Sequence, residues 1–199
     1  ICDISFEARS QWEEYWLIDP LDGTKEFIKK NGEFTVNIAL ISDNLPVFGV
    51  INIPVFNQTY WGHIDIGSFI IEKNKSTRKL NITKSSNSTL KIIASLSHPS
   101  NLLNKILERI DDYEILNKGS SLKFCLVASG KADLYPRFVP TCEWDTAAGQ
   151  AIIKYAGGYI KDIDGKEITY NTKESFVNPS FIASNDNQLI ERIIKLTKN

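Results

Sequence analysis

The sequence predicts an α/β protein in which short strands alternate with helices. Apolar residues alternate or run together over residues 34–41 and 47–53, which is typical of core strands. Over residues 101–110 the apolar positions recur at helical spacing. The 199 residues are 42% hydrophobic and 24% charged. A chain of this size and composition buries a core as one domain or as two closely joined lobes.

The first half of the chain is predicted to form an antiparallel sheet. A strand over residues 14–18 leads into a loop, and Asp43-Asn44 is the turn between the two core strands. Residues 60–62 and 68–72 continue the same sheet, and a polar linker follows at 73–88. We therefore place one lobe at residues 1–88 and a second at 89–199.

The second half alternates strands with helices. Ser100 or Asn101 caps the helix at 101–110, Gly130 ends a helix at 120–129, and Gly157-Gly158 closes one that Asp145 begins. A last helix starts at Asn187. The predicted strands are residues 90–95, 113–116, 132–135, 159–162 and 181–184.

The segment Asp19-Pro20-Leu21-Asp22-Gly23-Thr24 has the residue types of a cation and phosphate site. Pro20 disfavours helix at Asp19, so the Asp19 side chain is expected to project forward from an extended backbone. Gly23 allows close approach of a ligand, and the N–H groups at the following helix start suit an anion. The Thr24 hydroxyl is placed to orient a water. Carboxylates without His or Cys favour magnesium or manganese.

A second segment, Trp144-Asp145-Thr146-Ala147-Ala148-Gly149, adds a third carboxylate at another helix start. Taken alone, each segment has a plain structural explanation. Asp-Pro and Asp-Gly are common turn dipeptides, and Asp145 could be an ordinary N-terminal residue of a small-residue helix. The combination of the two segments favours a shared metal site.

Charge and composition exclude several other classes. The formal net charge of −1 and the scattered basic residues give no nucleic-acid signature. No apolar run approaches the roughly twenty residues that span a bilayer. Cys2, Cys125 and Cys142 lack metal-binding spacing and are expected to be reduced thiols, which favours the cytoplasm.

These motifs resemble the inositol monophosphatase superfamily of magnesium-dependent, lithium-sensitive phosphatases. Within it, residues 15–39, 119–138 and 144–149 are most similar to the CysQ-type 3'(2'),5'-bisphosphate nucleotidases. The resemblance covers almost the whole chain. It implies a layered α+β sandwich of the sugar-phosphatase type, and hydrolysis of a phosphate monoester by a metal-activated water.

The resemblance also implies roles for single residues. Asp19 would bridge two Mg²⁺ ions, the Leu21 carbonyl would bind the first of them, and Asp22 and Asp145 would hold the second. Two or three ions are expected, and Mn²⁺ is an alternative. Thr24 would orient the attacking water. The substrate would contact Leu21, Asp22, Gly23, Thr24 and Asp145.

Substrate choice depends on Ser120, Lys123 and Arg137. From the residues alone, Ser120 and Ser121 could be capping serines and the two cations ordinary surface charges. Equally, the Gly119-Ser120-Ser121 turn could offer an anion free donors while Lys123 and Arg137 hold a second phosphate. The resemblance favours the second interpretation and adds His98 near the nucleoside. The expected reaction removes the 3'-phosphate of 3'-phosphoadenosine 5'-phosphate, giving AMP for sulfur metabolism.

In the family, an N-terminal helical region precedes the first motif and carries an acidic pair whose Glu binds metal. Glu7, Glu13 and Glu14 lie too close to the motif to match that pair, so this region is expected to be missing here. Two alternatives therefore stay open: an inositol monophosphatase-like phosphatase and an inactive fragment without the catalytic Glu. The expected partner is a small nucleotide bisphosphate. The expected place is the cytoplasm, with the inner face of the cell membrane as an alternative. The oligomeric state and peripheral membrane contact stay open.

Overall fold

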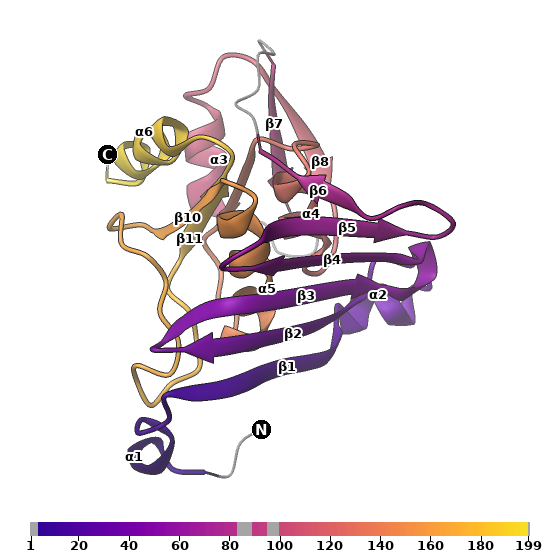
Figure 1. Cartoon of the computed structure of the whole chain (residues 1–199). Coiled ribbons are helices and arrows are strands. Elements are labelled where there is room, and N and C mark those ends of the chain that lie inside the picture. Colours follow the sequence, from indigo (N-terminus) through magenta and orange to yellow (C-terminus); the bar gives the residue numbers. More distant parts are fainter. Residues whose placement is uncertain (1–3, 83–88, 95–99, 199) are drawn as a thin grey trace.

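A computed structural model describes residues 4–82, 89–94 and 100–198. Two β-sheets and the helices around them form layers in this part of the chain (Figure 1). The α/β class predicted from the sequence is confirmed.

The first sheet is antiparallel throughout, with its strands in chain order from β1 to β6. The strands are β1 (Glu14–Asp22), β2 (Thr35–Ser42), β3 (Leu45–Ile53), β4 (Gln58–His63), β5 (Gly67–Glu72) and β6 (Arg78–Leu80). The prediction of a continuous polar linker at 73–88 is wrong at β6, because Arg78 and its neighbours pair with β5. Two short elements were not predicted, α1 (Phe6–Arg9) and the 3-10 turn η1 (Pro54–Phe56). Helix α2 (Thr24–Ile28) is the one expected to start after Gly23.

The second sheet is mixed and has the order β10-β11-β9-β7-β8. Its strands are β7 (Leu90–Ala94), β8 (Tyr113–Asn117), β9 (Leu134–Arg137), β10 (Tyr159–Asp162) and β11 (Phe181–Ser184). The accompanying helices are α3 (Asn101–Leu107), α4 (Leu122–Ala128), α5 (Glu143–Tyr155) and α6 (Asn187–Thr197). Ser100 is the cap of α3, and its hydroxyl accepts from the Leu103 N–H. The division into lobes at residue 88 stays a prediction.

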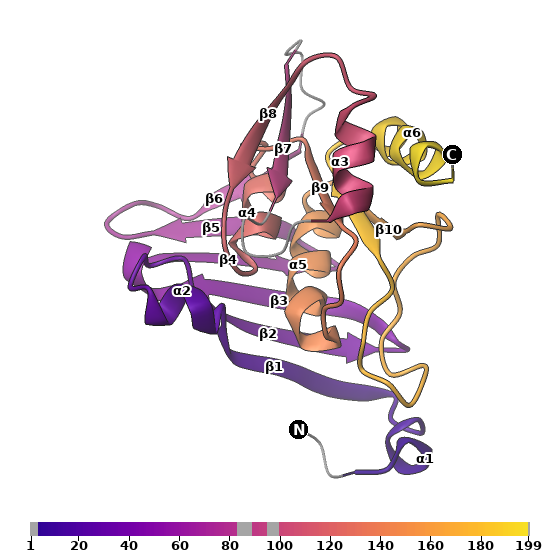
Figure 2. The ribbon, with the colours of Figure 1, turned by 180° about the vertical axis from the view of Figure 1, so that it is seen from behind.

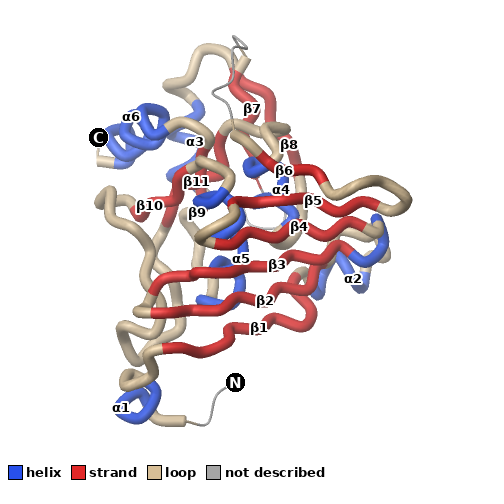
Figure 3. The backbone as a smooth tube through the Cα atoms, viewed as in Figure 1, coloured by secondary structure: helices blue, strands red, loops and turns tan. Residues whose placement is uncertain are grey.

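Helices α4 and α5 lie between the two sheets, and α3 and α6 pack on the far side of the second sheet (Figures 1 and 2). The tube in Figure 3 shows the strands of the first sheet running side by side in front of α5. The larger core cluster joins both sheets through α4 and α5, and the smaller one joins the second sheet to α3 and α6. This order of layers confirms the sandwich that the resemblance implied.

Helix α5 approaches the first sheet closely because two paired strand positions lack side chains. Gly49 of β3 lies opposite Gly62 of β4 in the ladder. A Cβ on Gly49 would lie 2.6 Å from the Ala148 carbonyl oxygen, and one on Gly62 would lie 3.0 Å from the Ala151 carbonyl oxygen. The two glycines therefore form a groove that seats the helix, and its small residues match the groove.

The other face of the first sheet is apolar and open. Trp16 is 55% exposed and Ile18 is 54% exposed, and the face is turned toward the viewer in Figure 1. The ladder places ten apolar side chains on it: Trp16, Ile18, Val36, Ile38, Leu40, Phe48, Val50, Trp61, Phe69 and Ile71. No helix of the described residues covers this surface. So large an apolar face is unusual on a free monomer.

The open face gives the first testable prediction. Replacing Trp16 with Lys and Ile18 with Thr removes two of its most exposed apolar side chains, so binding of a hydrophobic fluorescent dye is expected to fall at least twofold. Light scattering at high concentration is expected to fall with it. The control is Ile66→Lys, which removes a similarly exposed side chain (51%) in the β4–β5 turn. Equal dye binding by all three proteins would contradict this reading of the face.

Candidate active site

A β-bulge brings the first two carboxylates to the same face of β1. Side chains alternate along a regular strand, so residues three apart point to opposite faces. In the ladder, however, Asp19 lies opposite Asn37 and Asp22 lies opposite Thr35. The three-residue advance from Asp19 to Asp22 on β1 thus matches a two-residue advance on β2. The extra residue on β1 places both carboxylates on the same face of the strand. The predicted end of this strand at residue 18 is wrong, since the strand continues through the bulge to Asp22.

The third carboxylate comes from the first turn of α5. This helix starts at Glu143, two residues before the predicted start, and Cys142 is its N-cap. The Cys142 N–H donates to Asp145 Oδ2 at 2.7 Å, which orients the carboxylate. One ligand oxygen from each of Asp19, Asp22 and Asp145 lies within 4.8 Å of the other two. The structure therefore brings together three acids that are far apart in sequence.

Burial and mutual repulsion make the ionised form of these carboxylates less favourable. Burial, together with the charges of Asp22 and Asp19, raises the pKa of Asp145 to about 6, although the hydrogen bond from the Cys142 N–H acts in the opposite direction. Burial also raises the pKa of Asp19, while the Leu21 N–H at 3.0 Å from its Oδ1 acts in the opposite direction. A bound cation would relieve this repulsion.

Asp22 is held by a residue of the second half of the chain. Its Oδ2 accepts from the Ser121 backbone N–H at 2.6 Å and from the Ser121 hydroxyl at 2.5 Å. Longer contacts at 3.3 Å and 3.4 Å come from Thr35 and Asn37. Sequence reasoning missed this role of Ser121, because it depends on a contact between residues 99 positions apart.

The turn before Ser121 is anchored on Glu33. Its carboxylate accepts from the Gly119 N–H and from Lys118 Nζ, both at 2.7 Å. The Ser120 hydroxyl donates to the Glu33 carbonyl, and Ser120 has a left-handed backbone (φ 44°). Glu33 and Asp22 therefore accept from the Gly119 N–H, the Ser120 hydroxyl and both donors of Ser121, and a contact of this turn with a substrate anion stays a prediction.

One cavity collects most of the predicted site residues. The predicted residues in its lining are Asp22, Gly23, Thr24, Ser120, Lys123, Arg137 and Asp145. Glu26, Thr141 and Thr146 line it as well and were assigned no role from the sequence. Leu21 lies in the bulge beside it, next to Asp19. His98 lies outside the described residues.

We call the part of the lining formed by Lys123 and Arg137 the cationic wall, and the part formed by Asp22 and Asp145 the acidic wall. Lys123 is only 5% exposed, and its Nζ lies 5.5 Å from the centre of the Tyr135 ring and 3.4 Å from the Lys118 carbonyl oxygen. Arg137 Nε is buried without a hydrogen-bond partner. Two poorly compensated cations therefore line the same cavity as Asp22 and Asp145.

The buried lysine gives a prediction about stability. Burial lowers the pKa of Lys123 to about 8, a shift that Asp22 opposes and Arg137 strengthens. The unfolded chain keeps the ordinary lysine pKa, so between about pH 8 and 10 it binds more protons and stability rises with pH. At pH 7 the buried charge costs up to about 3 kcal/mol. Lys123→Met is expected to raise the free energy of unfolding at pH 7 by about 1–3 kcal/mol and to flatten that pH dependence.

Urea unfolding at pH 7 and pH 9.5 measures this effect. Lys105→Met, at an exposed position of α3, is the matched control and is expected to change stability by less than about 0.5 kcal/mol. Destabilisation of Lys123→Met at pH 7 would show instead that the ammonium group is well paired.

The donor set fits a hard divalent cation. Three carboxylates supply oxygen ligands, and the Asn37 Oδ1, on the residue paired with Asp19, is buried without a hydrogen-bond partner. The described cysteines do not enter this set. Cys125 is buried and Cys142 partly buried, both are free thiols, and burial raises the pKa of each. Cys2 lies outside the described residues.

Comparison with known proteins places this geometry in a family. The model of the inositol monophosphatase family matches residues 4–199. The chain belongs to the inositol monophosphatase family. This family is metal-dependent, and its members here share the two-sheet fold, which confirms the resemblance found in the sequence. The described helices include none long and apolar enough to cross a membrane.

Relatives within the family carry a specific name. A 3'(2'),5'-bisphosphate nucleotidase CysQ of Salmonella typhimurium is 47% identical over 177 residues, covering 89% of this chain and 70% of its own length. The protein of the same name from Escherichia coli K12 is 46% identical and covers 90% of this chain and 71% of its own length. The crystal structure of CysQ from Bacteroides thetaiotaomicron superposes with a TM-score of 0.83 at 36% identity, over 94% of this chain and 75% of that one.

Proposed function

We propose that this protein is a magnesium-dependent 3'(2'),5'-bisphosphate nucleotidase that removes the 3'-phosphate of 3'-phosphoadenosine 5'-phosphate to give AMP. The relatives named above support the activity, at up to 47% identity over about nine tenths of the chain. The observation that carries the proposal is one cavity with an acidic and a cationic wall. Two charged walls suit a substrate that bears two phosphates, one of them bound to cations.

In this proposal the acidic wall holds the reacting phosphate. Asp19, Asp22, Asp145 and the Leu21 carbonyl would hold two or three Mg²⁺ ions, with Mn²⁺ as a substitute. Bound cations neutralise phosphate charge and make water more acidic. Thr24, in the cavity lining, orients the attacking water. Water attacks phosphorus, the bond to the ribose 3'-oxygen breaks, and the proton that the water loses is passed to that oxygen, which leaves as the free hydroxyl.

The cationic wall holds the rest of the substrate. Lys123 and Arg137 bind the 5'-phosphate, and an anion there would compensate the buried ammonium group. The Ser120 hydroxyl already donates its proton to the Glu33 carbonyl, so it can only accept a hydrogen bond from the substrate. The backbone of Ser120 is the other group that this residue contributes. The proposed contact of His98 with the nucleoside concerns a residue outside the described part.

A phosphate-release assay tests the proposal. We expect Mg²⁺-dependent release from 3'-phosphoadenosine 5'-phosphate to exceed release from inositol 1-phosphate at least tenfold, and Li⁺ to inhibit it. Preference for inositol 1-phosphate would overturn the nucleotide assignment and favour a monophosphatase. Absence of release from either compound, with Mn²⁺ bound at the acidic wall, would identify an inactive fragment.

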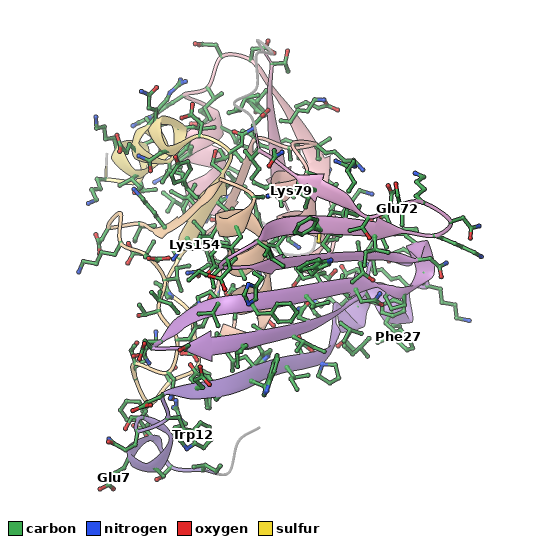
Figure 4. The ribbon with its side chains drawn as sticks, viewed as in Figure 1. Glu7, Trp12, Phe27, Glu72, Lys79 and Lys154 are labelled. Carbon is green, nitrogen blue, oxygen red and sulfur yellow. The ribbon has the colours of Figure 1, made fainter. Side chains whose placement is uncertain are left out.

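Glu7 does not belong to the carboxylate cluster of the described residues. Glu7 lies on α1, and Figure 4 shows it at the opposite corner of the first sheet from Phe27 on α2. In the described part of the chain the carboxylate cluster contains no fourth acid.

A role for the protein in sulfur metabolism and its location in the cytoplasm belong to this proposal, as does its small-molecule partner.

A further inference from the structure

Ser121 occupies a position between two of the three acids. It is 2% exposed, and its hydroxyl lies 2.5 Å from Asp22 Oδ2 and 3.1 Å from the Asp145 backbone oxygen. A hydroxyl has one proton, so the shorter contact is the donated hydrogen bond. Asn37 Nδ2 donates to the same hydroxyl oxygen at 2.8 Å and fixes its direction.

The contacts to Asp22 all fall on one oxygen. Among the described residues, Oδ2 accepts from the Ser121 N–H, the Ser121 hydroxyl, Thr35 and Asn37. A carboxylate oxygen with this many donors has little capacity left for a cation. Oδ1 is therefore the atom of Asp22 that faces the acidic cluster.

Ser121 is itself held by contacts outside the cluster. The Gly119 N–H and Lys118 Nζ bind the Glu33 carboxylate, and the Ser120 hydroxyl binds the Glu33 carbonyl. These contacts maintain the left-handed backbone at Ser120, a conformation that costs a non-glycine residue energy. The turn thus presents both donors of Ser121 to Asp22.

We infer that Ser121, oriented by Asn37, is a positioning residue that turns Asp22 Oδ1 toward the cation. The inference rests on the proposed metal site and deepens it. Mutation of a residue that hydrogen-bonds to a metal ligand commonly lowers the metal affinity 10- to 100-fold. Ser121→Ala keeps the backbone donor and removes the hydroxyl, so the loss is expected near the lower end of that range.

The test measures Mn²⁺ affinity of the 199-residue chain by calorimetry, at a temperature where every variant is folded. We expect Ser121→Ala to weaken binding about tenfold and Ser121→Thr, which keeps the hydroxyl, to stay within about threefold of wild type. Asn37→Ala removes the orienting donor and is expected to weaken binding about threefold to tenfold. It provides a second measurement should Ser121→Ala not fold.

Ser184→Ala is the matched control. Ser184 is fully buried, and its hydroxyl donates to the Asp133 carbonyl at 2.7 Å, within the second sheet. Unchanged affinity in this control, with weaker binding in Ser121→Ala and Asn37→Ala, supports the inference. Wild-type affinity in Ser121→Ala, or equal weakening in Ser184→Ala, overturns it. Failure of the wild-type chain to bind Mn²⁺ overturns the proposed metal site itself, which is a separate result.

Discussion

Replacing Asp22 with Asn is expected to lower Mg²⁺-dependent phosphate release at least about a hundredfold. The change removes one of three charges that lie within 4.8 Å of each other and keeps the size of the side chain. A cation contributes several kcal/mol to stabilising the transition state of phosphoryl transfer, and about 3 kcal/mol corresponds to two powers of ten in rate. The same variant is expected to bind Mn²⁺ more weakly.

The change to Asn also disturbs the contacts behind Asp22. The new amide would place a donor or a neutral oxygen against the two donors of Ser121. Asp65→Asn, at an exposed turn position, is the control and is expected to keep wild-type release. Equal turnover by Asp22→Asn and wild type would show that Asp22 is not part of the catalytic cation site.

Replacing Gly49 with Ala is expected to lower the free energy of unfolding by about 3 kcal/mol. The new Cβ would lie 2.6 Å from the Ala148 carbonyl oxygen and 2.8 Å from the Ala148 Cα. Both atoms belong to the backbone of α5, so relief requires moving the helix or bending the strand. Overpacking of this kind typically costs 1–3 kcal/mol or more.

Chemical denaturation measures the loss, and Mn²⁺ binding at low temperature measures its consequence. Since Asp145 lies in the first turn of the helix that rests on Gly49, displacement of α5 is expected to weaken cation binding as well. Val50→Ile, one position along β3 on the open face, is the control and is expected to cost less than about 1 kcal/mol. Wild-type stability in Gly49→Ala would contradict the close seating of α5.

At the bulge between Asp19 and Asp22, the sequence correctly indicated an irregular backbone but did not indicate which kind of structure forms there. Pro20 and Gly23 indicated a break in regular structure, and a loop was expected. The structure instead extends the strand and inserts one residue. Local sequence indicates an irregularity, but the partner strand decides whether it becomes a loop or a bulge.

At the Gly119-Ser120-Ser121 turn, the sequence indicated hydrogen-bond donors but not the groups that accept from them. Small residues before a helix indicated donors for an anion, yet the acceptors are Glu33 and Asp22 of the first half of the chain. Nothing within a few residues of the turn indicates these partners. The strand β6 was missed for a related reason, because its three residues are polar or charged apart from Leu80 and pair only once β5 is in place.

The sequence by itself determined the alternation of strands and helices, the residue types of the three acids and the family to which they point, because these depend on short patterns of polarity and turn chemistry. Only the tertiary structure decided which atoms meet: the three carboxylates at one point, Ser121 against Asp22, and Lys123 buried in the cavity wall. Contacts between residues about 100 positions apart depend on how α5 and the sheets pack, and packing is a property of the whole chain.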